Sequence, residues 1–192
     1  MKFLTTAIAA TLVTSAALAQ DTKSEKLDGG VSIALSKGWK VERFVNPAMN
    51  MPSMKEMMVG ASETRLRKGS TGVLVSYMHF KTDKKPDGMD EAALASQEEA
   101  VIRAGTQYLR QSVETEVSPR SEIVGELGVS LATLTARSGE KFNVRAGYPG
   151  GCVTTGSIRR GAAVWAVSVA SDSCSSGTHT EMVDALYSAS SE

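Results

Sequence analysis

Residues 152–170 read CVTTGSIRRGAAVWAVSVA, and this stretch decides the fold class. Residues 153–159 and 164–170 are two short runs rich in β-branched residues, separated by the hairpin-like segment Arg160-Gly161-Ala162-Ala163. The second run is almost entirely apolar, which is typical of a strand in the middle of a sheet. The sequence therefore predicts a β-hairpin near the centre of a sheet.

The same hairpin brings the only two cysteines together. If Arg159 pairs near Val164, Cys152 lies opposite residues 171–172, a short step from Cys174. An even cysteine count in an exported chain favours a disulfide, and a loop of about 23 residues would give it roughly 3 kcal/mol. We therefore predict a Cys152–Cys174 disulfide. A reactive thiol or half of a metal site is disfavoured, because no CxxC occurs and no histidine lies near Cys152 in sequence.

Alternating patterns upstream predict more strands. Residues 31–41 (VSIALSKGWKV) alternate in hydrophobicity on both sides of Gly38, which is typical of a β-hairpin. Residues 59–67 and 73–81 flank the turn-like segment 68–72 and predict a second hairpin. Residues 122–135, with turn or bulge points at Gly125 and Gly128, and residues 141–148 predict further strands.

Two segments have helical periodicity. Residues 90–113 carry an apolar stripe through Ala95, Ile102 and Leu109, and Asp90 and Glu91 suit a helix N-terminus. Near the C-terminus, the spacing of Thr178 and Glu181 matches a capping box for a short helix whose buried face includes Met182 and Leu186. His179 would then be solvated in the first turn.

Together these elements predict one α+β domain over residues 29–190, preceded by a flexible lead at residues 20–28. In this fold an antiparallel sheet is covered by a long central helix and a short C-terminal helix.

This element order resembles the PsbP-like α/β/α sandwich, a family whose bacterial relatives include exported DcrB-like proteins. The opening strand followed by Gly38-Trp39 carries the resemblance, whereas Ser36 stands where proline is common in the family. The resemblance implies a non-catalytic binding or accessory module, and it supplies no catalytic residues.

Residues 1–19 have the features of a cleaved signal peptide. Lys2 precedes an apolar run that is too short to span a bilayer, and Ala17-Leu18-Ala19 is an A-x-A cleavage site before Gln20. We expect a soluble, periplasmic or secreted protein with no integral membrane segment in the mature chain. Its 21 basic and 21 acidic residues balance, which argues against nucleic acid as a partner.

A methionine cluster is the most unusual local feature: Met49, Met51, Met54, Met57 and Met58 fall within ten residues. Flexible thioether side chains make adaptable apolar surfaces. We therefore expect this segment to meet a partner protein or a small apolar ligand, without a cofactor. Trp39 and Phe44 are candidate aromatic anchors, although either ring also suits a core.

Copper binding is the alternative. Thioether sulfur is a soft, neutral ligand for Cu(I), so Met51, Met54, Met57 and Met58 form a candidate site, with His79 as a nitrogen ligand. A hydrolase ranks last, because the chain has only two histidines and neither G-x-S-x-G nor H-E-x-x-H occurs.

Overall fold

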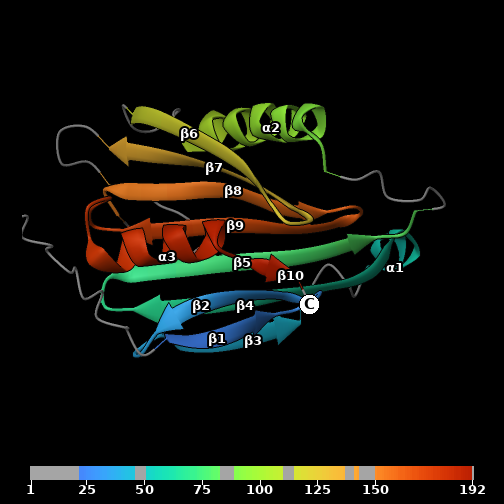
Figure 1. Cartoon of the computed structure of the whole chain (residues 1–192), viewed down its shortest axis with the longest axis horizontal. Coiled ribbons are helices and arrows are strands. Elements are labelled where there is room, and N and C mark those ends of the chain that lie inside the picture. The colour runs from blue at the N-terminus through green and yellow to red at the C-terminus, as the bar shows by residue number, and fades with distance from the viewer. Residues whose placement is uncertain are drawn as a thin grey trace, which may run out of the picture.

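The computed structural model describes residues 22–45, 51–82, 89–109, 115–136, 141–142 and 150–191. These residues form one antiparallel sheet of seven strands and a second of three (Figure 1). In spatial order the large sheet consists of β3 (Lys40–Val45), β4 (Met58–Lys68), β5 (Thr71–Phe80), β9 (Ala163–Ser171), β8 (Cys152–Arg160), β7 (Leu127–Ala136) and β6 (Thr115–Val124). The small sheet consists of β1 (Thr22–Leu27), β2 (Val31–Ser36) and β10 (Ser190–Ser191). The helices are α1 (Pro52–Met57), α2 (Glu91–Leu109) and α3 (Gly177–Tyr187).

The central hairpin is confirmed. β8 pairs with β9 so that Arg159 lies opposite Val164 and Cys152 lies opposite Ser171. β9 is the fourth of the seven strands, as its apolar sequence predicts, and Trp165 is fully buried within it. The predicted hairpin of residues 59–67 and 73–81 is also present, as β4 and β5.

The predicted fold class is wrong. The structure is mostly β-strand in two sheets, and no long helix covers the centre of a single sheet. α2 contacts β6, β7 and β8, at one side of the large sheet. The small sheet packs with α3 on the opposite face, where both contribute to one apolar core (Figure 1).

Part of this error lies in residues 20–28, which we expected to form a flexible lead. Residues 22–27 instead form β1, which pairs along its whole length with β2. Only Glu25 and Leu27 are buried in this strand, so its sequence has no apolar alternation to reveal it. Pairing with the apolar β2 supplies the stability that the β1 sequence lacks.

The predicted hairpin at residues 31–41 is also wrong, although both strands exist. β2 pairs with β1 and β10 in the small sheet, whereas β3 pairs with β4 in the large one. Gly38 adopts φ +100°, which lets the chain turn sharply from one sheet into the other. The turn predicted at Gly125 (φ +61°) is confirmed, because this residue begins the turn between β6 and β7, whereas Gly128 pairs in register with Ile123 inside the hairpin.

The helix predicted over residues 90–113 is present as α2, described from Glu91 to Leu109, and residues 110–113 of the prediction lie outside the described part of the chain. Asp90 caps it, accepting a hydrogen bond from the Ala93 amide at 2.8 Å. Its most buried described side chains are Gln97 and Val101, not Ala95. Gln97 is a polar residue on the buried side of α2, and it attaches the helix to the sheet by donating hydrogen bonds to the backbone carbonyls of Gly128 and Ser157. All helices in the described ranges are too short or too polar to cross a lipid bilayer.

The capping box predicted at the start of the terminal helix is wrong. Ser176 is the N-cap of α3, and its hydroxyl accepts from the His179 amide. Glu181 instead accepts hydrogen bonds from the Ser36 amide and the Trp39 indole, each at 2.9 Å, and from the Lys68 ammonium at 3.0 Å. The carboxylate thus links α3 to the connection between the two sheets.

Candidate functional site

A cavity of about 600 Å³ lies at one end of the large sheet, where three β-turns meet. Its walls come from the β1–β2, β6–β7 and β8–β9 turns and from the adjacent end of β5. The lining residues are Gly29, Tyr77, His79, Met89, Gly125, Glu126, Arg160, Gly161, Ala162 and Ala163. Because these segments are distant in sequence, only the folded chain creates the cavity.

Aromatic rings form one wall of this end cavity. The ring of Tyr77 lies 5.3 Å from that of Trp165 and 6.5 Å from that of His79, measured between centroids. The Trp165 indole donates a hydrogen bond to the Asp28 carbonyl at 2.6 Å, which fixes its orientation. Burial raises the pKa of Tyr77, and the nearby Arg160 charge partly opposes that rise. Tyr77 therefore presents a neutral hydroxyl at neutral pH.

Gly29 holds the β1–β2 turn against this aromatic wall. Its φ is +82°, and a Cβ at this position would lie under 3.0 Å from both the Tyr77 and Trp165 rings. The Gly29 carbonyl accepts a hydrogen bond from Arg160 Nη2 at 2.8 Å. The Arg160 guanidinium is thus held in place at the cavity wall before any ligand arrives.

The lining combines a fixed cation with apolar surface. Arg160 and His79 can donate hydrogen bonds to an anion. Met89 and the Tyr77 ring supply apolar contacts, and the Glu126 carboxylate reduces the net positive charge of the cavity. The ten lining residues include no serine, threonine or cysteine that could act as a nucleophile beside His79. The arrangement can bind a small anionic molecule.

The methionine cluster does not contribute to the described lining of this cavity. Met51 and Met57 are 55% and 52% exposed on and beside α1, whereas Met58 is 3% exposed and faces the core. Met54 is partly buried in the same helix, and Met49 lies outside the described residues. The exposed methionines fit the predicted partner-facing surface, which stays a prediction.

His79 lines the end cavity, whereas none of the described methionines of the cluster belongs to that lining. The described segments also contain no cluster of three His, Cys, Asp or Glu side chains suited to a metal ion. The Cu(I) hypothesis for Met51, Met54, Met57 and Met58 with His79 therefore stays a prediction.

The two candidate aromatic anchors have different surroundings. Trp39 packs against the main core and donates its indole N–H to Glu181. Both contacts stabilise the fold and account for the position of this ring. Phe44 is 41% exposed on the edge strand β3, with the Arg65 guanidinium 4.7 Å from its ring centroid. Trp39 is also partly exposed and lines a surface cleft, so both rings stay predicted anchors.

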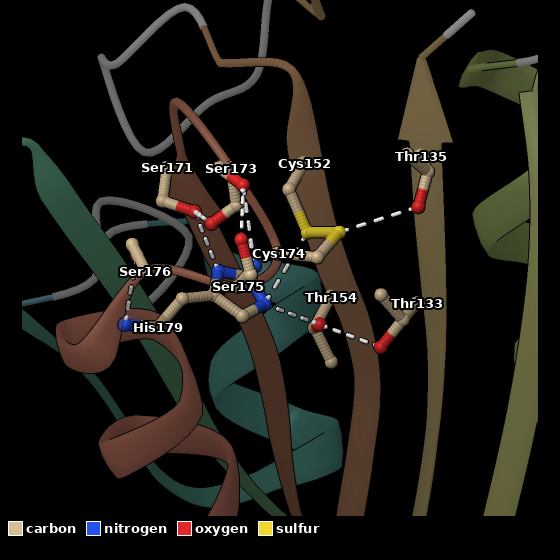
Figure 2. The surroundings of a disulfide bond; sticks show 10 residues. All are labelled: Thr133, Thr135, Cys152, Thr154, Ser171, Ser173, Cys174, Ser175, Ser176 and His179. Atoms are coloured by element: carbon tan, nitrogen blue, oxygen red, sulfur yellow. Dashed lines mark hydrogen bonds between the residues drawn. A yellow bond between two sulfur atoms is a disulfide. The ribbon is translucent and has the colours of Figure 1, made fainter.

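The predicted Cys152–Cys174 disulfide is confirmed, and it joins β8 to the loop before α3 (Figure 2). Next to it lies a hydrogen-bonded network around His179, which is 2% exposed rather than solvated. Ser171 Oγ donates to the Ser173 carbonyl at 2.9 Å and accepts from His179 Nδ1 at 2.8 Å. His179 Nε2 then accepts from the Thr154 hydroxyl at 2.8 Å, and the network assigns this tautomer. Burial lowers the pKa of His179, so its ring is neutral at pH 7.

Sequence reasoning missed both the end cavity and the buried histidine. The cavity has no local motif, because turns far apart in the chain supply its walls. His179 had a usable signal: it lies three and seven residues before Met182 and Leu186, on the buried face of α3. The capping-box interpretation hid that signal.

Comparisons with known proteins give no relative. No protein-family model matches the chain, no curated protein matches it, and no solved structure matches it. The resemblance to PsbP-like proteins therefore stays a prediction.

Proposed function

We propose that this chain is an exported, non-catalytic binding protein that holds a small organic anion with an apolar body in the end cavity. The observation that carries the proposal is the Arg160 guanidinium, fixed by the Gly29 carbonyl beside a Tyr77–Trp165 ring pair. A planar guanidinium matches the geometry of a carboxylate and can donate two hydrogen bonds to it.

The size and rigidity of the site support this proposal. Ligand cavities commonly measure about 300–1,000 Å³, and this one measures about 600 Å³. A cation that is already oriented loses little conformational entropy when it binds. Export is supported by the disulfide, because such bonds persist in oxidising compartments, and by the predicted signal peptide.

The test compares phenylacetate with its uncharged analogue 2-phenylethanol. Trp165 packs on the cavity wall, so its fluorescence reports binding, and calorimetry gives the affinity. We expect phenylacetate to bind and 2-phenylethanol to bind much more weakly. Loss of a charge-assisted hydrogen bond should weaken phenylacetate binding roughly tenfold in Arg160→Gln.

Arg159→Gln is the matched control, because Arg159 is the neighbouring, exposed residue and lies outside the cavity lining. This variant should bind phenylacetate as the wild type does. The proposal fails if neither compound shows saturable binding, if the alcohol binds as well as the acid, or if both arginine variants lose affinity equally.

A further inference from the structure

The two sulfurs of the disulfide have different surroundings (Figure 2). Cys152 is completely buried, and its Sγ lies 3.5 Å from His179 Nε2. Cys174 is partly exposed, and its Sγ lies 3.3 Å from the Thr135 hydroxyl on the other side of the bridge. One sulfur therefore faces the protein interior and the other faces outward.

A surface cleft of about 600 Å³ opens beside the outward sulfur. Its lining residues are Thr135, Ala136, Lys141, Gly151, Asp172, Ser173, Cys174 and Ser175. Cys174 lines this cleft and Cys152 does not. The Lys141 ammonium lies 3.6 Å from an Asp172 carboxylate oxygen, so the cleft presents both charges to solvent. A small zwitterionic thiol has the size and charge pattern to enter it.

We propose that Cys174 is a site of thiol–disulfide exchange with a small external thiol of the glutathione class. The thiolate attacks Cys174 Sγ and forms a new S–S bond, while the Cys152–Cys174 bond breaks. Cys152 leaves with the electron pair and takes up one proton from solvent. The products are a mixed disulfide on Cys174 and a thiol on Cys152, so oxidation and reduction balance.

Burial determines which of the two sulfurs the external thiolate attacks. Exchange requires the attacking sulfur to reach the sulfur under attack, and Cys152 is inaccessible at 0% exposure. The new Cys152 thiol lies in a buried site, 3.5 Å from His179 Nε2, which already accepts from the Thr154 hydroxyl, and burial disfavours the thiolate. The interior can therefore hold Cys152 as a neutral thiol.

The first experiment maps the adduct in the folded wild-type protein. The oxidised protein is incubated anaerobically with reduced glutathione, quenched with acid, alkylated with N-ethylmaleimide and digested for mass spectrometry. We expect glutathione on Cys174 and the alkyl group on Cys152, at least tenfold over the reverse pattern. Equal labelling, or glutathione mainly on Cys152, would overturn the proposal.

Because a mixed disulfide can close again quickly, the second experiment measures each sulfur alone. The Cys152→Ser and Cys174→Ser variants, each confirmed as folded by circular dichroism, react with 5,5′-dithiobis(2-nitrobenzoate). The free Cys174 in Cys152→Ser should react at least tenfold faster than the free Cys152 in Cys174→Ser. Equal rates, or a Cys174 that reacts only after unfolding in guanidinium, would show a purely structural bridge. Neither experiment uses the end cavity, so the result is independent of the proposed ligand.

Discussion

At the scale of single residues, Gly29 controls the shape of the end cavity. It combines a left-handed backbone with close contact to two aromatic rings, so a methyl group adds both backbone strain and overlap. We predict that Gly29→Ala lowers the free energy of unfolding by about 2 to 4 kcal/mol, through strain and overpacking. Urea unfolding followed by circular dichroism measures this loss.

Gly69→Ala is the matched control for that prediction. Gly69 also has a positive φ, +58°, but a Cβ there would meet nothing within 4 Å. It should lower the stability by only about 1 to 2 kcal/mol, the strain contribution alone. If the two variants lose the same stability, the ring contacts of Gly29 do not matter energetically.

His179 gives the molecule a pH dependence. Burial lowers its pKa in the folded state below the ordinary value of 6.5, so the folded chain resists protonation more than the unfolded chain. Its stabilising effect is complete above about pH 6.5 and is lost as the pH falls toward the folded-state pKa. Urea midpoints at pH 7.5 and 5.5 should therefore differ in the wild type, and the difference should shrink in His179→Gln. An unchanged difference would assign the pH effect to other groups.

Sequence reasoning at this scale succeeded where one local pattern determined the contact. The register of the residue 152–170 hairpin follows from its loop, so the Cys152–Cys174 pair could be predicted. Arg160 could not be recognised as a binding residue, because its partner Gly29 lies 131 positions away. Glu181 was misassigned for the same reason: its three hydrogen-bond donors belong to distant segments.

At the scale of elements, the Glu181 carboxylate joins α3 to both sheets through hydrogen bonds. Burial by itself would raise the pKa of Glu181, but hydrogen bonds from Ser36, Trp39 and Lys68 lower it to about 2. Since the folded-state pKa lies below the ordinary value of 4.5, the stabilisation is present above pH 4.5 and is lost as the pH falls toward about 2.

We predict that Glu181→Gln destabilises the fold by about 1 kcal/mol at pH 7, a value reduced by partial solvent screening. Thermal unfolding at pH 7 and pH 3 measures the loss and its decrease in acid, since pH 3 lies between the unfolded-state and folded-state pKa values of this carboxyl. Glu99→Gln, which removes an exposed carboxylate paired with Arg103, should have almost no effect. A larger effect in the control variant would contradict the assigned role of Glu181.

The strands themselves were easier to predict than their partners. Period-two alternation identified β2, which buries Val31, Ile33 and Leu35, and β3, whose Val41 packs against the same core. Alternation does not specify which edge a strand joins, and here the two strands enter different sheets. The predicted fold class was wrong because the sequence pattern did not show that β2 pairs with β1 and β10. This pairing creates a second sheet, and the small sheet covers part of the large one.

At the scale of the whole molecule, the disulfide restricts the unfolded chain across 22 positions. Replacing both cysteines in Cys152→Ala/Cys174→Ala should lower the free energy of unfolding by about 3 kcal/mol. Urea unfolding of the double variant beside the oxidised wild type measures this difference. A reduced wild type in excess reductant should match the double variant, and a mismatch would mean that the alanine substitutions disturb packing.

The pairing of β10 with β2 has a consequence for the order of events in time. Ser190 and Ser191 lie opposite Ser32 and Val31, and α3 packs on β2 as well. The ribosome releases these late residues last, so β2 has its neighbour β1 from the start but lacks β10 and α3 until synthesis ends. A nascent chain arrested near residue 150 should therefore leave the β2 edge that faces β10 open to hydrogen exchange. Completing the small sheet is then a late step, which fits the proposed export of this chain.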